Sequence, residues 1–309
     1  VRDAAGQIVG SRYNKGTPDE SDCAEICMTE DFWHEKLEGY VKTLADFGVD
    51  GVYLDSVGCG SSPCYATNHQ HTPGRGGPWW TAGVRRLMTR LKQTPGPDGK
   101  RLIFTTEAFS ESCLDGFDAF LPHIHHPRPD EGCVYDALYH DYTVFHGAHV
   151  GTWEPYKPDG TLPRVAARCF ALGRPLGWFY HGLYNHYYLR PEAAPDMVFL
   201  RELSRARMSL TRFLGTGTMW HPPQVVMPEG TGEGVLASMW QADDEILLIA
   251  VNGCTGPQGF RLRVASPARG KILEAAWPES GERLTSAADG LTPSLHLEAR
   301  SMCAWITRL

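Results

Sequence analysis

The stretch FGVDGVYLDSVGCG, Phe47 to Gly60, carries a carboxylate at the end of a short run of strand-forming residues. The segment Gly51 to Asp55 is apolar in its middle, as expected of a parallel strand buried under helices. A predicted helix, Thr29 to Phe47, precedes it, and Gly48 occupies the position where helices usually end. Asp55 either caps the following turn or carries chemistry, and this stretch alone leaves both open.

The same unit then repeats along the chain. Pro78 begins a second predicted helix, the segment TPGPDGK stops it, and the strand RLIFTTE ends in a second carboxylate, Glu107. Strand-like runs follow at residues 117–121, 133–140 and 175–180, and further helices are predicted at 162–172 and 195–213. Alternating helices and strands with polar residues at strand ends predict an α/β fold of the (β/α)8 TIM-barrel type.

The pattern supplies five strands, whereas a closed barrel needs eight. Residues 1–216 are therefore predicted to be the C-terminal, catalytic portion of a barrel, about strands 4 to 8. The chain begins with Val1, so either a leader has been removed or the chain is a fragment. Either an N-terminal barrel portion in a longer polypeptide or a second chain would then cover the open sheet edges.

After Thr216 the pattern changes to short strands separated by Gly, Pro and Ser, without helical spacing. Residues 217–309 are predicted to form an antiparallel β-sandwich. This segment lacks clustered histidines or carboxylates, which favours a packing or accessory role.

Composition excludes several classes of partner. The 309 residues carry a net charge of −7 with both signs spread along the chain, so neither nucleic acid nor another polyanion is expected to bind. No apolar run approaches the ~18 residues that cross a bilayer. We expect a soluble protein with no membrane partner, and a secreted or periplasmic location is one option. The nine cysteines are scattered buried thiols or, if the protein is exported, include a Cys23–Cys27 or Cys59–Cys64 disulfide.

Asp55 and Glu107 end successive strands, so they are expected at the same face of the barrel. Two such carboxylates are what glycoside hydrolysis needs, with a separation of about 5 Å for retention and about 6.5–9.5 Å for inversion. Alternatively, Asp55 caps a turn and Glu107 pairs with an arginine. Asp115 or Asp118 is a further candidate for the acid, and Glu107 is preferred because it ends a longer strand.

Several other side chains are predicted to bind a sugar substrate. The polar loop from Cys64 to Trp80 is expected over the barrel mouth, where histidines donate to hydroxyls and a tryptophan stacks on a pyranose. This mixture of polar and aromatic groups suits a neutral glycan. The predicted substrate-binding residues are His69, His71, Trp79, His140, Asp141, Trp178 and Tyr180. For His140, a place in the hydrophobic core is an equally good hypothesis.

A catalytic metal site is the rival hypothesis. His69, His71, His123, His125 and His126 form a histidine-rich set with His-x-His spacing. Both groups lie in predicted loops rather than on a first barrel strand, so the preferred hypothesis involves no metal and no cofactor.

Four segments together resemble a group of bacterial glycosidase-like barrel proteins, largely described as a domain of unknown function. They are FWHEKLEGYVKTLADFGVDGVYLDSVG, CYATNHQHTPGRGGPWWTAGVRRLM, FTTEAFSESCLDGFDAFL and LYHDYTVFHG. More distantly, GVDGVYLDSV and TTE resemble strand motifs of the alpha-amylase clan and of endo-alpha-N-acetylgalactosaminidases.

This resemblance implies roles for individual residues. Asp55 would be the nucleophile, Glu107 the general acid/base of a retaining mechanism, and Asp141 a third carboxylate that clamps sugar hydroxyls. The chain departs from the alpha-amylase clan in its longer Asp55 to Glu107 separation and in lacking the first three strands. The resulting prediction is a glycoside hydrolase acting on a neutral glycan, alpha-linked if the distant resemblance extends to the substrate. A catalytically silent carbohydrate-binding protein and a metal-dependent hydrolase are the alternatives.

Overall fold

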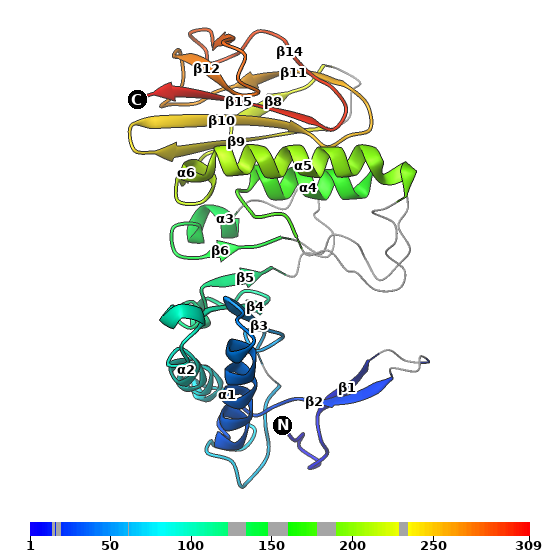
Figure 1. The fold of residues 1–309 in the computed structure, drawn as a ribbon, viewed down its shortest axis with the longest axis vertical. Helices are drawn as coiled ribbons and strands as arrows, with labels where there is room; N and C mark the ends of the chain where they lie inside the picture. The colour runs from blue at the N-terminus through cyan, green and yellow to red at the C-terminus, as the bar shows by residue number, and fades with distance from the viewer. Residues whose placement is uncertain are drawn as a thin grey trace. The chain divides into compact units, whose positions relative to one another are not determined.

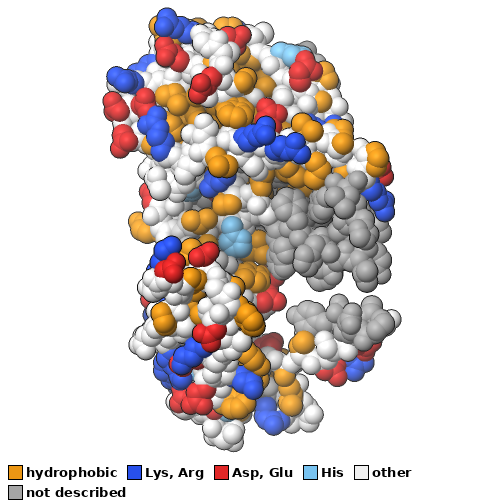
Figure 2. Space-filling view, viewed as in Figure 1, with side chains coloured by type: hydrophobic (Ala, Val, Ile, Leu, Met, Phe, Trp, Pro, Cys, Tyr) orange, Lys and Arg blue, Asp and Glu red, His pale blue; other side chains and the backbone are white. Residues whose placement is uncertain are grey.

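The structure is a computed structural model, and it describes residues 1–13, 16, 20–60, 62–122, 134–147, 160–177, 190–228 and 234–309. Contacts divide the chain into two compact units, Val1–Leu121 and Pro122–Leu309 (Figure 1). Each unit is described by itself. Over the face drawn in Figure 2, acidic and basic side chains are interspersed.

The first unit contains a parallel sheet in the order β3 (Gly51–Leu54), β4 (Ile103–Glu107) and β5 (Ala119–Leu121). Helix α1 (Asp31–Asp46) leads into β3, and α2 (Trp79–Leu91) connects β3 to β4. The inward face of α2 is fully buried, with Val84, Leu87, Met88 and Leu91 at helical spacing. The predicted repeat of helix and parallel strand is therefore present in this unit.

The start of the first unit differs from the sequence prediction. A hairpin of β1 (Gly10–Tyr13) and β2 (Ser21–Ala24) precedes α1, and its short polar strands gave no signal in the sequence. Helix α1 begins after Glu30 rather than after Thr29, whose hydroxyl instead hydrogen-bonds the Glu30 side chain at 3.0 Å. Two short 3₁₀ turns, η1 (Pro97–Gly99) and η2 (Glu111–Cys113), lie between the later elements.

The second unit begins with helices and ends with strands. Its helical elements are α3 (Val134–Tyr139), α4 (Thr161–Ala171), η4 (Pro191–Ala193), α5 (Ala194–Ser209) and α6 (Thr211–Leu214). Its strands are β6 (Val144–Phe145), β7 (Thr218–Trp220), β8 (Gln224–Val226), β9 (Val235–Ala242), β10 (Glu245–Asn252), β11 (Gln258–Arg263), β12 (Ile272–Trp277), β13 (Arg283–Thr285), β14 (Leu295–Leu297) and β15 (Ser301–Arg308). Strands β13-β12-β15-β10-β9-β7 form one antiparallel sheet, and β14-β11-β8 form a second.

Strand β10 explains how the layers of this unit are held together. Its Leu247, Ile249 and Val251 belong to a core shared with α4 and α5, whereas Ile246, Leu248 and Ala250 belong to a core shared with β11. Successive side chains of a strand point to opposite faces, so a continuous apolar run is buried on both sides. Figure 1 shows α4 and α5 lying along one face of this sheet.

This packing bears on the domain organisation. The predicted boundary between residues 216 and 217 follows the change from helices to strands, whereas contacts divide the chain at Leu121, because α4 and α5 share a core with β9 and β10. The assignment of 1–216 to a barrel portion and 217–309 to a β-sandwich stays a proposal.

Three predicted elements of the second unit differ from the structure. Residues 134–139 form helix α3 instead of a strand, and the buried Asp136 within it pairs with Arg174, a distant contact that no local pattern reveals. The helix predicted at 195–213 ends at Ser209 and a new short helix begins at Thr211. Residues 175–177 are not a strand, and 178–180 lie outside the described residues. No described helix is both long and apolar enough to cross a membrane.

The Asp136–Arg174 ion pair is expected to be a strong determinant of stability in the second unit. Two hydrogen bonds of 2.7 and 2.8 Å join the groups, and the side chains are only 2% and 4% exposed. Asp136→Ala leaves a buried guanidinium unpaired and should lower the free energy of unfolding by about 3–5 kcal/mol in chemical denaturation. The double variant Asp136→Leu/Arg174→Met should recover most of that loss. Glu274→Ala, which breaks the exposed pair with Arg283, is the control and should cost less than about 1 kcal/mol.

Candidate active site

Asp55 and Glu107 come together at the carboxyl ends of neighbouring parallel strands. The register pairs Leu54 with Thr106, which places Asp55 level with Glu107. The two side chains are joined by a hydrogen bond. Burial raises the pKa of Asp55, although the residue keeps solvent exposure, and the hydrogen bond and charge of Glu107 raise this pKa further. Two carboxyl groups this close cannot both ionise easily, so the pair favours holding one proton.

Three polar residues that were not predicted to belong to the site surround the pair. The Tyr53 hydroxyl donates to Asp55 Oδ1 at 3.4 Å, and Ser56 Oγ donates to Glu107 Oε2 at 2.9 Å. Cys59 Sγ donates to the backbone carbonyl of Glu107 at 3.2 Å, and burial raises the pKa of this thiol to about 11. Tyr53 had a usable sequence signal, because residues two apart in a strand share a face.

The backbone beside both carboxylates is in the left-handed region. Ser56 has φ 59° and Ala108 has φ 56°, and each directly follows a carboxylate of the pair. Residues other than glycine rarely adopt this conformation, and such strain is concentrated at functional sites. The turn after Asp55 returns the chain over Glu107, which is how Ser56 reaches the second carboxylate.

Gly58 fixes the loop after β3 against β4. Its N–H donates to Thr106 Oγ1 at 2.9 Å, and the same hydroxyl donates to the Leu54 carbonyl at 2.7 Å. A Cβ at Gly58 would lie 2.4 Å from Thr106 Cγ2, so the approach requires glycine. This contact holds the two strand ends, and therefore the two carboxylates, in one arrangement.

The other two candidates for the acid, Asp115 and Asp118, form ion pairs with arginines. Asp118 precedes β5, accepts a hydrogen bond from the Phe104 N–H at 2.8 Å and pairs with Arg101 at 2.7 Å. Phe104 lies three residues before Glu107 in the same strand, so Asp118 is at the amino end of the sheet. Asp115 pairs with Arg85 at 3.0 Å. Of these carboxylates, Glu107 is the one that contacts Asp55.

The loop between β3 and α2 brings His69, His71 and Trp79 together. The His71 ring stacks on Trp79 with 4.5 Å between centroids, and the His69 and His71 rings meet edge to face at 5.7 Å. His71, Trp79 and Arg75 line a pocket of about 350 Å³. Burial lowers the pKa of His69, which favours its neutral imidazole. The assignment of these residues to sugar binding stays a prediction.

The other predicted substrate residues lie in the second unit or outside the described residues. His140 follows α3 and packs edge to face on Trp240 at 4.7 Å, and burial lowers its pKa. Asp141 is exposed beside it. Their substrate roles stay predictions. Trp178, Tyr180, His123, His125 and His126 lie outside the described residues.

The cysteines in the first unit do not form the disulfides considered from the sequence. Cys23, Cys27, Cys59 and Cys64 are free thiols. Sequence proximity suggested Cys23–Cys27 and Cys59–Cys64, whereas the fold brings Cys27 next to Cys64.

Comparison with known proteins confirms the predicted resemblance to a family of unknown function. Residues 1–149 match the family described as "Domain of unknown function (DUF6259)". The chain is 32% identical over 188 residues, 59% of its length, to a protein of Bacteroides thetaiotaomicron named "Putative glycoside hydrolase". It is 29% identical over 158 residues, 49% of its length, to "Putative glycoside hydrolase 22789" of Monosiga brevicollis. The matched segments span 26% and 13% of these two relatives.

Solved structures show a likeness to alpha-amylases at the level of the fold. A maltogenic alpha-amylase from Thermotoga neapolitana matches with a TM-score of 0.63 and 13% identity, over all of this chain and 72% of that one. An alpha-amylase from Geobacillus thermoleovorans, solved with acarbose, matches with a TM-score of 0.59 and 15% identity, over 95% of this chain and 67% of that one. The mixed α/β fold with a β-sheet part is thus alpha-amylase-like.

Gly58→Ala tests the contact that sets the two strand ends. The new Cβ would overlap the fully buried Thr106 side chain, so the free energy of unfolding should fall by about 1–3 kcal/mol in chemical denaturation. Gly39→Ala in α1 is the matched control. Nothing lies within 4 Å of a Cβ there, so alanine should raise stability by up to about 1 kcal/mol. Equal effects of the two changes would contradict the proposed close contact.

The raised pKa of Asp55 predicts a pH-dependent cost to stability. A carboxyl that binds its proton more tightly in the folded state loses stability as the pH rises from its unfolded pKa, about 4, through its folded pKa. Asp55→Asn should therefore raise the melting temperature at pH 7 and leave it unchanged near about pH 3. Thermal denaturation over this range measures the difference. A melting temperature that falls at pH 7 would show that the ionised pair is not strained.

Proposed function

We propose that this chain is part of a glycoside hydrolase in which Asp55 is the nucleophile and Glu107 the general acid/base of a retaining mechanism. The observation that carries the proposal is the hydrogen-bonded carboxyl pair at the carboxyl ends of β3 and β4. Active sites of (β/α) barrels are built at this end of their strands. The two relatives named as glycoside hydrolases support the same class of enzyme.

The contact between the two side chains favours retention over inversion. Carboxyl groups in a retaining site are about 5–5.5 Å apart, and in an inverting site about 6.5–9.5 Å apart to admit a water. A direct interaction between the two side chains is closer to the shorter, retaining separation. A pair that shares one proton would suit this mechanism, because the acid must be protonated while the nucleophile is ionised.

Neighbouring donors support the proposed roles, although the pKa of Asp55 is raised overall. The Tyr53 hydroxyl and the Ser56 backbone N–H both donate to Asp55, and each lowers its pKa. These bonds stabilise the carboxylate form that attacks the anomeric carbon. Glu107, holding the shared proton, then donates it to the leaving oxygen, and as a carboxylate it activates the water that releases the sugar.

The substrate proposed is a neutral glycan. The stacked His71 and Trp79 rings beside a pocket of about 350 Å³ give an aromatic surface and hydrogen-bonding groups suited to a pyranose. An alpha linkage is proposed from the alpha-amylase-like fold. An N-terminal barrel portion would complete the site, with residues 217–309 as an accessory β-sandwich.

Substitution of each carboxylate tests the two roles. In a preparation that hydrolyses an aryl glycoside, Asp55→Ala should abolish turnover, and Glu107→Ala should lower kcat by about 10²–10⁴-fold for poor leaving groups and less for activated ones. Azide should rescue both variants, giving a glycosyl azide of inverted configuration with Asp55→Ala and of retained configuration with Glu107→Ala. Steady-state kinetics and NMR of the products measure this.

Asp118→Ala is the control and should leave kcat unchanged. Full activity in both carboxylate variants would rule out the proposed pair. Glycan binding without hydrolysis of any glycoside tested would instead favour the catalytically silent carbohydrate-binding protein.

A further inference from the structure

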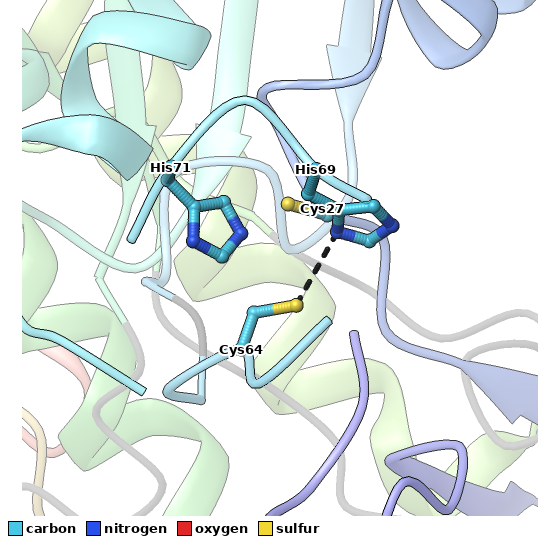
Figure 3. A group of neighbouring side chains, drawn as sticks. All are labelled: Cys27, Cys64, His69 and His71. Carbon is cyan, nitrogen blue, oxygen red and sulfur yellow. Dashed lines mark hydrogen bonds between the residues drawn. The ribbon is translucent and has the colours of Figure 1, made fainter. Parts of the chain in front are cut away.

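Four potential metal ligands meet in the first unit, and the His69/His71 pair is the only part of the set that a sequence motif indicates. They are Cys27, which precedes α1, and Cys64, His69 and His71 in the loop that follows β3. One ligand atom from each residue lies within 4.8 Å of every other. Figure 3 shows the four side chains surrounding one common space, with Cys64 Sγ directed at the His69 ring. Both cysteines are buried and both histidines are partly buried.

His71 is oriented as a metal-binding histidine usually is. His71 Nε2 is buried and has no hydrogen-bond partner among the described residues, while His71 Nδ1 is 3.2 Å from the Thr72 carbonyl. A metal-bound histidine commonly donates its other ring N–H to such a carbonyl, which leaves the free nitrogen for the metal. A buried nitrogen without a partner is costly in any other role.

The distances suit a small tetrahedral ion. Cys64 Sγ lies 3.4 Å from His69 Nδ1. With Zn–S of about 2.3 Å and Zn–N of about 2.0–2.1 Å, the edges of a tetrahedral Cys₂His₂ site are about 3.3–3.8 Å long. Small side-chain movements would therefore bring all four atoms to one ion.

We propose that Cys27, Cys64, His69 and His71 bind a structural Zn²⁺ ion. Two thiolates and two imidazoles form a closed set that suits zinc and leaves no open position for a substrate or water. Neither Asp55 nor Glu107 belongs to this set. The site carries no reacting group and therefore differs from the metal-dependent hydrolase considered above. It shares His69 and His71 with the proposed sugar-binding residues, so a bound ion would leave Trp79 as the group that contacts the sugar.

The ion would cross-link the loop after β3, which carries Cys64, His69 and His71, to the segment before α1, which carries Cys27. This segment is already held in place, because Gly83 of α2 packs closely against the Met28 carbonyl and Cys27 Sγ contacts Thr29 Oγ1 at 3.2 Å. The loop is held by the Gly74 N–H, which donates to the Cys64 carbonyl at 2.7 Å. His71 then carries the constraint to Trp79, on which it stacks.

Zinc titration of the reduced, chelator-treated chain tests the proposal. Wild type should bind one Zn²⁺ per chain, measured with a competing chromophoric chelator and by elemental analysis. Cys64→Ser and His71→Gln should each weaken binding by more than the about 10–100-fold typical of outer-shell changes. Cys23→Ser, which removes an exposed free thiol, is the matched control and should bind as wild type does.

Alkylation of the wild-type chain gives a second test that does not depend on the folding of variants. Zn²⁺ should slow the labelling of Cys27 and Cys64 and leave Cys23 and Cys59 unchanged. The proposal fails if wild type binds no Zn²⁺, if labelling of Cys27 and Cys64 is unaffected, or if the double variant Cys64→Ser/His71→Gln keeps the metal. A Cys27–Cys64 disulfide in the native protein would also overturn it.

Discussion

The parallel pairing of β3 with β4 is the constraint on which the candidate active site depends. Like-charged groups repel, so a fold brings two carboxyls together only when stronger contacts fix the strands that carry them. Here the parallel pairing of β3 with β4 provides the register, and Gly58 with Thr106 joins the loop of one strand to the other. The left-handed residues Ser56 and Ala108 mark the two points where the backbone is strained around the pair.

Much of this site was predictable because it depends on local patterns. A helix, a strand with one buried face and a terminal carboxylate occur twice in succession, and parallel strands place their carboxyl ends at one edge. The sequence therefore predicted that Asp55 and Glu107 meet. It also offered Asp118 as a lower-ranked candidate, and the ion pair with Arg101 and the bond from the Phe104 N–H show that Asp118 has other partners.

The features that the sequence did not reveal depend on distant contacts. The local pattern predicted a strand where the structure has helix α3. The buried Asp136 of this helix pairs with Arg174, 38 positions away, and no local pattern reveals this contact. The cysteines illustrate the same limit: spacing suggested bonds between near neighbours, but the loop after β3 folds back to place Cys64 beside Cys27, 37 positions earlier (Figure 3). The His-x-His spacing indicated only His69 and His71, because the two cysteines come from distant segments and have no characteristic spacing.

The central claim is that Asp55 attacks the sugar. A fluorinated glycosyl fluoride, which forms a covalent glycosyl-enzyme quickly and hydrolyses slowly, traps this intermediate for peptide mass spectrometry. Attack by Asp55 predicts one sugar per active chain, attached to Asp55 through an ester, and no labelling of Asp55→Asn. A sugar attached to Glu107 or to any other residue would contradict the role of Asp55 as the nucleophile.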